Sequence, residues 1–256
     1  MIKIAVVGCT GKLGSMISKS ILSGDKSIVL AYAIGRKGND YVGNDISSII
    51  GGKNRGITII DDICNAKDCD VFIDCTNAEA LIHNNLIKYR QIKKPLVIAT
   101  TGMNEPGLSQ IRALSEYVPV FISSNFSIAL HNFIETLKFA VRMISDDTDV
   151  QIIEYHHNQK KDAPSGTAIM IQEALIKENP RLNKQNVNIS SIRGGNIFGE
   201  HVVLFANSKD EITEYKHRVS SREAFSNGAI LAAKWLAGKP AGLYNMDDFC
   251  KSNICK

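Results

Sequence analysis

The first half of the chain alternates short apolar runs with stretches whose apolar residues recur at helical spacing. Residues 2–7 are apolar on both faces, which is typical of a parallel strand buried on both sides of a sheet. Between Leu13 and Ile21 the apolar residues follow at helical intervals, which predicts one buried helical face that ends before Gly24. Further strand-like runs cover residues 28–34, 57–60, 71–73, 96–100 and 118–122. Because helical stretches separate several of these runs, the pattern predicts right-handed βαβ crossovers and a doubly wound parallel sheet of the α/β class.

After residue 126 the pattern changes to a long helix followed by strands. Apolar residues recur on one side of residues 128–144, which predicts a helix there. Strand-like segments cover residues 150–155, 187–192, 201–207 and 211–218, and a helical stretch lies near 167–177. This half therefore predicts a second, α+β domain with a mixed sheet. Ser221 is expected to cap a last helix, which Gly238 is expected to end in the left-handed conformation.

Composition excludes several kinds of function. The 256 residues are 44% hydrophobic and 22% charged, which is typical of a globular protein. The net charge of +4 comes without a basic tail, so we expect no nucleic-acid partner. No apolar run approaches the roughly 18 residues of a membrane span, and no signal-peptide pattern opens the chain, so we expect no membrane partner and a cytoplasmic location. The six cysteines lack the spacing and histidine partners of zinc modules, and we expect reduced thiols and no metal.

A glycine-rich turn joins the first strand to the first helix, at the place of a dinucleotide-binding turn in a Rossmann-like sheet. Gly8 permits the tight turn, Gly11 lets backbone N–H groups approach a pyrophosphate, and Gly14 lets helix and strand pack closely. The pyrophosphate is expected at the helix N-terminus, where unpaired N–H groups favour anions. The alternative is a plain strand–turn–helix that happens to contain three glycines.

The cofactor is expected to be NADPH or NADH. About 20 residues after such a turn, a carboxylate normally binds the ribose of NAD, whereas a basic residue accommodates the 2′-phosphate of NADP. This chain has Gly35-Arg36-Lys37 at that place. We therefore predict that NADPH is used at least as well as NADH, unless Arg36 and Lys37 form only a solvated loop.

The densest polar run of the chain, residues 154–167, follows a predicted strand and precedes a helix. An imidazole titrates near neutrality, so His156 or His157 could donate a proton, and Lys160 adds a cation. Backbone N–H groups at the start of the following helix suit a carboxylate, and they belong to Ser165, Gly166 and Thr167. The alternative is an exposed loop with an ordinary charged turn. Metal binding by the two histidines is disfavoured, because neighbours on an extended segment point to opposite faces.

This polar run resembles the signature of the 4-hydroxy-tetrahydrodipicolinate reductase family, E-x-H-H-x-x-K-x-D-A-P-S-G-T-A, over residues 154–168. Further agreement comes from residues 72–74, 100–102, 125–127, 199–201, 220–222 and 227–229, so the similarity covers nearly the whole chain. The sequence departs from the family pattern at three positions. Gly35 stands where many members carry the ribose-binding acid, Ala99 replaces a common glycine, and Cys75 replaces a frequent aromatic residue beside the nicotinamide.

The resemblance implies roles for individual residues. His156 is the implied general acid, Lys160 a second proton donor, and His157 contacts the substrate carboxylates. The remaining implied substrate contacts are Ser165, Gly166 and Thr167. The implied cofactor contacts are Gly8, Cys9, Thr10, Gly11, Lys12, Leu13, Arg36, Ala99, Thr100, Thr101, Ser123, Ser124, Asn125 and Phe126.

The resemblance also implies a reaction and an organisation. Members reduce 4-hydroxy-2,3,4,5-tetrahydrodipicolinate, a cyclic dicarboxylate, to 2,3,4,5-tetrahydrodipicolinate on the route to diaminopimelate and lysine, with a hydride from NADPH or NADH. A dinucleotide-binding domain of residues 1–126, completed by 221–256, is implied beside a substrate-binding and oligomerisation domain of residues 127–220. A homotetramer is implied as well. Two alternatives remain, namely a related reductase acting on an amino-acid semialdehyde or sugar, and a redox sensor that binds NADP without turnover.

Overall fold

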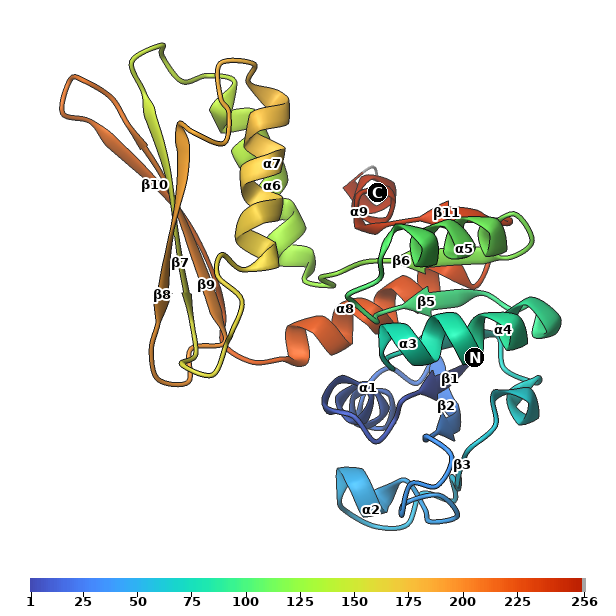
Figure 1. Cartoon of the computed structure of the whole chain (residues 1–256). Helices are drawn as coiled ribbons and strands as arrows, with labels where there is room; N and C mark the ends of the chain where they lie inside the picture. Colours follow the sequence, from blue (N-terminus) through green and yellow to red (C-terminus); the bar gives the residue numbers. More distant parts are fainter. Residues whose placement is uncertain (255–256) are drawn as a thin grey trace. The chain divides into compact units, whose positions relative to one another are not determined.

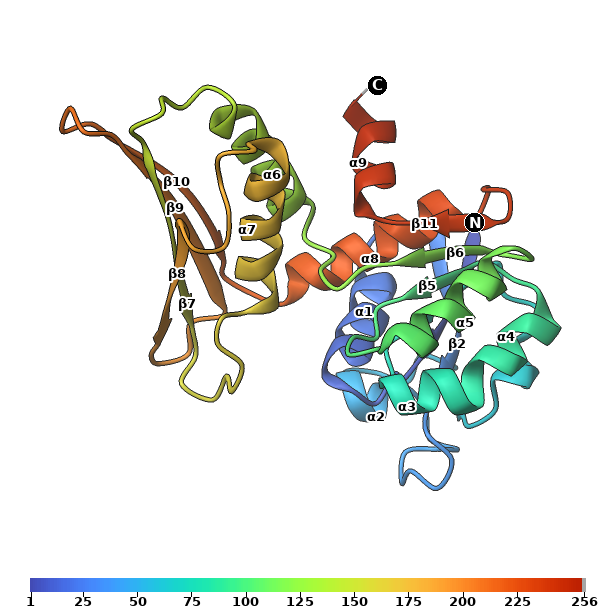
Figure 2. The same cartoon turned by 45° about the horizontal axis from the view of Figure 1, so that its top comes forward.

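A computed structural model of the chain describes residues 1–254, so Cys255 of the cysteine prediction lies outside the described residues. The chain forms two compact units (Figures 1 and 2). The first contains Met1–Phe126 together with the chain from Glu223 onward, and the second contains Ser127–Arg222. None of the described helices is long and apolar enough to cross a lipid bilayer.

The first unit is built on a parallel sheet with the strand order β11-β6-β5-β4-β1-β2-β3. The strands are β1 (Ile2–Val7), β2 (Ile28–Ile34), β3 (Ile59–Ile60), β4 (Val71–Asp74), β5 (Leu96–Ile98), β6 (Pro119–Ile122) and β11 (Gly242–Tyr244). Strand β1 pairs with β2 on one side and β4 on the other, both in parallel. The strand order therefore reverses beside β1, where ligands bind in open α/β sheets. The predicted doubly wound sheet is confirmed.

Helices cover both faces of this sheet, which explains why β1 is apolar and buried from Ile4 to Val7 (Figure 2). On one face Ala5 and Val7 belong to a core that includes Leu86 of α4 and Ile111 of α5. On the other face α8 packs against α1 and the central strands. The helical segments are α1 (Lys12–Ser23), α2 (Ser47–Ile50), η1 (Ile63–Ala66), α3 (Ala78–Ala80), η2 (Leu81–Asn85), α4 (Leu86–Ile92), α5 (Glu105–Ser115), α8 (Glu223–Leu236) and α9 (Met246–Ile254).

The C-terminal part of the first unit differs from the prediction. Helix α8 is not the last helix, because β11 and α9 follow it. The predicted left-handed stop at Gly238 is wrong, since Gly238 has no positive φ. The helix ends instead with N–H donation from Ala237 to Ala233 and from Lys239 to Leu236, which needs no left-handed residue. Strand β11 is only three residues long, too short for an alternating pattern to reveal.

The second unit has the mixed sheet that was predicted, with the strand order β10-β9-β7-β8. The strands are β7 (Asp149–His156), β8 (Val187–Arg193), β9 (Gly199–Ala206) and β10 (Ile212–Val219). Strands β7 and β8 are parallel and the other pairs antiparallel. Helices α6 (Ile128–Val141) and α7 (Gly166–Glu178) pack on one face (Figure 1). The apolar side of α6 is buried there, as its helical spacing predicted.

Candidate active site

The glycine turn of the first unit is built as its spacing predicts. Gly8 has φ +84°, and a Cβ on it would lie 2.8 Å from the carbonyl oxygen of Cys75. A Cβ on Gly14 would lie 2.2 Å from the Gly8 carbonyl oxygen, so only glycine lets helix α1 start this close to the turn. Gly11 is the N-cap of α1 and offers no side-chain cap. The N-terminus of α1 therefore presents backbone N–H groups suited to an anion.

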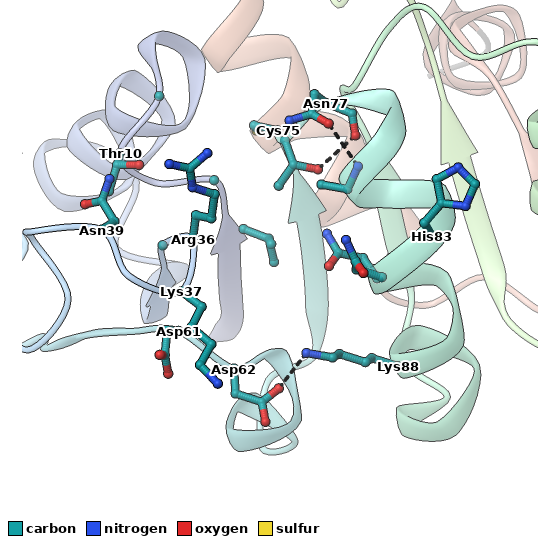
Figure 3. Close-up of a pocket in the computed structure, with 18 of the residues that line it drawn as sticks. Thr10, Arg36, Lys37, Asn39, Asp61, Asp62, Cys75, Asn77, His83 and Lys88 are labelled. Carbon is teal, nitrogen blue, oxygen red and sulfur yellow. Dashed lines mark hydrogen bonds and ion pairs between the residues drawn. The ribbon is translucent and has the colours of Figure 1, made fainter.

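A cavity of about 1000 Å³ lies beside this turn (Figure 3). It brings together four predicted cofactor contacts, Gly8, Thr10, Gly11 and Arg36. Lys37 also lines the cavity, and both basic side chains are exposed. Lys88 of α4 lines the cavity as well and pairs with Asp62 at 3.0 Å (Figure 3). The cavity therefore joins the phosphate turn to a basic rim, an arrangement that suits a nucleotide carrying several phosphates.

The other predicted cofactor contacts lie outside the lining of this cavity. Cys9 is fully buried, and burial raises the pKa of its thiol to about 12, so only its backbone can serve a ligand. Lys12 and Leu13 lie in the first turn of α1, and the segments 99–101 and 123–126 follow β5 and β6. Because the carboxyl ends of parallel strands meet at one edge of a sheet, these two segments share the edge with the glycine turn.

Sequence reasoning missed several cavity residues, among them Asp61, Asp62, Asn77 and Lys88. These residues come from segments that follow β3 and β4 and from α4, and no motif marks them in the sequence. Their position after a predicted strand could have indicated them, because ligands bind at the carboxyl ends of the strands in such a sheet.

In the second unit, His156 and Glu154 form a buried acid–base pair. Both residues lie near the C-terminal end of β7 with their side chains on its buried face, and Glu154 is fully buried. The Nδ1 atom of His156 contacts a carboxylate oxygen of Glu154, which leaves Nε2 as the ring nitrogen available for chemistry. Arg193, from the neighbouring strand β8, donates to both oxygens of Glu154 at 3.0 and 2.8 Å. A fixed carboxylate thus orients the imidazole, and a guanidinium fixes the carboxylate.

The electrostatics of this pair follow from burial and charge. Burial by itself raises the pKa of Glu154, but hydrogen bonds from Arg193, Ser191 and His156 outweigh it and hold the pKa at about 2. Burial lowers the pKa of His156, whereas Glu154 beside it acts in the opposite direction. Lys160 and Arg193 lower the pKa of His156 further. Glu154 is therefore a carboxylate throughout the physiological range, next to an imidazole that gives up its proton readily.

Ser165 and His201 complete the buried network. The backbone N–H of Ser165 donates to Glu154 Oε1 at 3.2 Å, and its hydroxyl contacts His201 Nε2 at 3.2 Å. The same hydroxyl caps helix α7 by accepting from the N–H of Ala168. The N–H and the hydroxyl of Ser165 are thus both engaged inside the protein, and its substrate contact stays a prediction. The ring of His201 packs edge-on against His156, with centroids 5.4 Å apart.

The other predicted catalytic and substrate residues lie between the end of β7 and the first turn of α7. Lys160 pairs with Asp162 at 2.7 Å, and this ion pair lies in the loop after β7. Gly166 is exposed at the first position of α7, and a Cβ on it would meet nothing within 4 Å. His157 and Thr167 are half-buried. Among the described residues, no cluster of three or more His, Cys, Asp or Glu side chains could hold a metal ion.

The stability of the second unit is expected to fall as the pH falls from about 6.5 to about 4. Burial lowers the pKa of His201 to about 4, and the neighbouring His156, His217 and Lys160 favour the neutral ring, whereas Glu154 opposes them. In this window the unfolded chain, with an ordinary imidazole pKa of about 6.5, binds a proton that the folded chain does not.

Urea unfolding at a series of pH values measures this loss directly. The His201→Gln variant removes the titrating ring, so its stability should change less over the same window. An equal slope in the variant and the parent protein would assign the loss to other groups.

The fold and the site together define a class, that of nucleotide-dependent oxidoreductases with a Rossmann-like unit and a second α+β unit. Comparison with known proteins makes the assignment particular. The family model described as dihydrodipicolinate reductase, N-terminus, matches residues 2–126, and the model for the C-terminus of the same family matches residues 130–250. The chain belongs to the dihydrodipicolinate reductase family, and the resemblance noted in the sequence is confirmed.

Individual relatives agree with this assignment. A 4-hydroxy-tetrahydrodipicolinate reductase from Pseudoalteromonas atlantica is 35% identical over 97% of this chain and 98% of its own. The solved structure of a dipicolinate-bound dihydrodipicolinate reductase from Paenisporosarcina sp. TG-14 has a TM-score of 0.76 at 21% identity, over 96% of this chain and 97% of that one. An amine dehydrogenase from Mycobacterium smegmatis has a TM-score of 0.62 at 12% identity, over 96% and 95% of the chains. These structures share the fold.

Proposed function

We propose that the chain catalyses the reduction of 4-hydroxy-2,3,4,5-tetrahydrodipicolinate to 2,3,4,5-tetrahydrodipicolinate, with NADPH or NADH as cofactor, in the diaminopimelate route to lysine. One observation supports this most strongly: in a chain of this family, His156 is held by a buried carboxylate at Nδ1 and keeps Nε2 for proton transfer. The bound dinucleotide would supply the hydride, and the protein supplies orientation, charge and protons.

The proposed roles of the second unit follow from its chemistry. His156 delivers a proton from Nε2 while Glu154 and Arg193 hold its ring. The absence of a side chain at Gly199, where a Cβ would lie 3.2 Å from Nε2, leaves room beside the reactive atom. Lys160 serves as a second proton donor, and its ammonium group pairs with Asp162.

The same unit is proposed to bind the two substrate carboxylates. His157, Gly166 and Thr167 offer an imidazole and the start of α7, where the helix dipole favours an anion. The dipicolinate in the Paenisporosarcina structure is a planar dicarboxylate, which fits a site of this kind in a relative. A substrate with two negative charges explains why a cation and a helix start gather in one segment.

The proposed cofactor preference rests on the basic rim of the cavity. Arg36 and Lys37 are exposed there, and Gly35 removes the carboxylate that would repel a 2′-phosphate. Arg36→Ala is expected to raise the KM for NADPH by about tenfold, as the loss of one charge-assisted contact implies, and to change the KM for NADH little. Steady-state kinetics with both cofactors measure this. An NADH preference of about tenfold or more in the parent protein would contradict the proposal.

We further propose a homotetramer that assembles through the sheet face opposite α6 and α7. On that face Glu200 is buried between Arg218 and Lys216 of β10, so an ion-pair cluster sits among apolar residues such as Ile153 and Val202. Light scattering should give four times the chain mass of 28.1 kDa. We place the protein in the cytoplasm, a reducing compartment in which its scattered cysteines would stay thiols.

The decisive test of the function is an absorbance assay of NADPH oxidation with freshly prepared condensation product of pyruvate and aspartate semialdehyde. Turnover with this product, and none with amino-acid semialdehydes or sugars alone, is the expected result. Binding of NADPH without any turnover would favour the redox sensor instead. The matched control omits pyruvate, so that the cyclic substrate cannot form.

A further inference from the structure

The first unit contains a buried carboxylate, Asp74, that the proposed reaction does not use. Asp74 is the last residue of β4 and is fully buried. Its Oδ1 atom accepts hydrogen bonds from the backbone N–H of Thr76 at 3.0 Å, the hydroxyl of Thr76 at 2.6 Å and the hydroxyl of Thr100 at 3.0 Å. Its Oδ2 atom accepts from the amide of Asn85 at 3.0 Å and from the hydroxyl of Tyr89 at 2.7 Å.

These contacts are those of a negatively charged group. A backbone N–H and an amide point at the two oxygens, and three hydroxyls lie within hydrogen-bond distance, a setting that favours a carboxylate. Burial raises the pKa of Tyr89 well above its usual value, and the Asp74 charge adds to this, so the phenol keeps the proton that it donates. Within residues 1–254, no Lys, Arg or His side chain bonds to Asp74. Dipoles stabilise this charge, and no cation neutralises it.

The position of Asp74 places this charge on one particular side of the nucleotide cavity. The pyrophosphate turn follows β1, and Arg36, which marks the adenosine side, follows β2. Strand β4 lies on the other side of β1, so the nicotinamide half of a bound dinucleotide belongs over β4 and β5. Cys75 and Asn77, directly after Asp74, line the cavity (Figure 3).

We propose that Asp74 is a positioning residue for the nicotinamide half, and that its charge favours the oxidised, cationic ring over the reduced, neutral one. The inference rests on the proposed function. Asp74 ties the loop after β4, through Thr76, to the loop after β5, through Thr100. A bound dihydronicotinamide that donated the C4–H electron pair to the substrate carbon would be left with a positively charged ring. A nearby buried negative charge therefore assists hydride donation, because it acts in a medium of low dielectric.

The test removes the charge and keeps the shape. In Asp74→Asn the new amide nitrogen would face Asn85 and Tyr89, and both can adapt, since an amide can turn to present its oxygen and a hydroxyl can accept. Without substrate, the dissociation constant for NADP⁺ is expected to rise about tenfold relative to that for NADPH, as the loss of one buried charge implies. Calorimetry measures the oxidised form and nicotinamide fluorescence the reduced form.

Two further variants separate charge from structure. Tyr89→Phe removes one hydrogen bond to Asp74 but keeps its charge, so the ratio of the two dissociation constants should stay as in the parent protein. Asp74→Ser is a second uncharged replacement, smaller and with room for a water. It should change the ratio of the two dissociation constants in the same direction, and it serves as the test if Asp74→Asn folds poorly. An equal loss of affinity for both forms in the uncharged variants would overturn the charge effect. A parent protein that binds neither form would overturn the proposed function itself.

Discussion

Replacing His156 with alanine is expected to lower kcat by about 10²-fold to 10⁴-fold, the usual contribution of a general acid. Glu154 contacts the Nδ1 atom of His156 and so orients the ring, which leaves Nε2 for proton donation. His201 cannot substitute, because it is buried and its Nε2 is engaged by Ser165. NADPH should bind to the variant as it does to the parent protein, since the nucleotide cavity belongs to the first unit.

The matched control for this experiment is His217→Ala. His217 is another partly buried imidazole of the same sheet, it packs against Phe133, and it has no place in the proposed chemistry. Its loss should leave kcat within about twofold of the parent value, as for substitutions away from the site. Turnover that stays unchanged in His156→Ala would remove the residue from its proposed role, and loss of NADPH affinity would point to a folding defect.

The sequence predicts the strands and helices that carry the site because each has a clear period. The glycine turn could be predicted for another reason, because Gly8 and Gly14 have steric requirements, such as the 2.2 Å contact that a Cβ on Gly14 would make. Asp74 and Arg193 could not be predicted in the same way. Asp74 looks like the polar end of a strand, and its donors lie 2 to 26 residues further along the chain. Arg193 reaches Glu154 only because β8 pairs in parallel with β7.

At Ser165 the sequence motif and the structure indicate different partners for the same N–H group. The start of a helix with exposed N–H groups predicts a carboxylate site, and the serine stands at that start. The structure directs its N–H to a carboxylate of the protein itself, Glu154. A local motif indicates that an N–H group can bind an anion, but only the tertiary structure shows that this anion is a carboxylate of the protein itself.

Replacing Arg193 with methionine is expected to destabilise the protein by about 3–5 kcal/mol at neutral pH and above, as for the loss of one partner of a buried ion pair. Arg193 is largely buried, donates twice to Glu154 and also binds the carbonyl of Asp162 at 2.8 Å. Without it, the fully buried Glu154 carboxylate loses a fixed cation and keeps its contacts with His156, Ser165 and Ser191. The measurement is urea unfolding of the variant and the parent protein at matched pH.

The pH dependence of this deficit distinguishes a lost ion pair from lost packing. Arg193 lowers the pKa of His156, so its removal raises that pKa. The folded variant then gains a proton at a pH where the folded parent does not, which restores a cation beside Glu154. The stability of the variant therefore rises relative to that of the parent as the pH falls through about 6.5, and the difference between their free energies of unfolding narrows. The basic limb of the pH profile of kcat should move to higher pH for the same reason, because the His156 ring keeps its proton up to a higher pH.

Arg181→Met is the matched control for the Arg193 variant, because Arg181 also forms an ion pair in the second unit, with Asp146 at 2.6 Å, but both side chains are well exposed. Its loss should cost at most about 1 kcal/mol and leave the kcat profile in place. A deficit in Arg193→Met that stays constant from pH 8 to pH 5, by the linkage argument, would mean that Arg193 contributes packing alone. In that case His156 would be oriented by Glu154 without electrostatic help from the neighbouring strand.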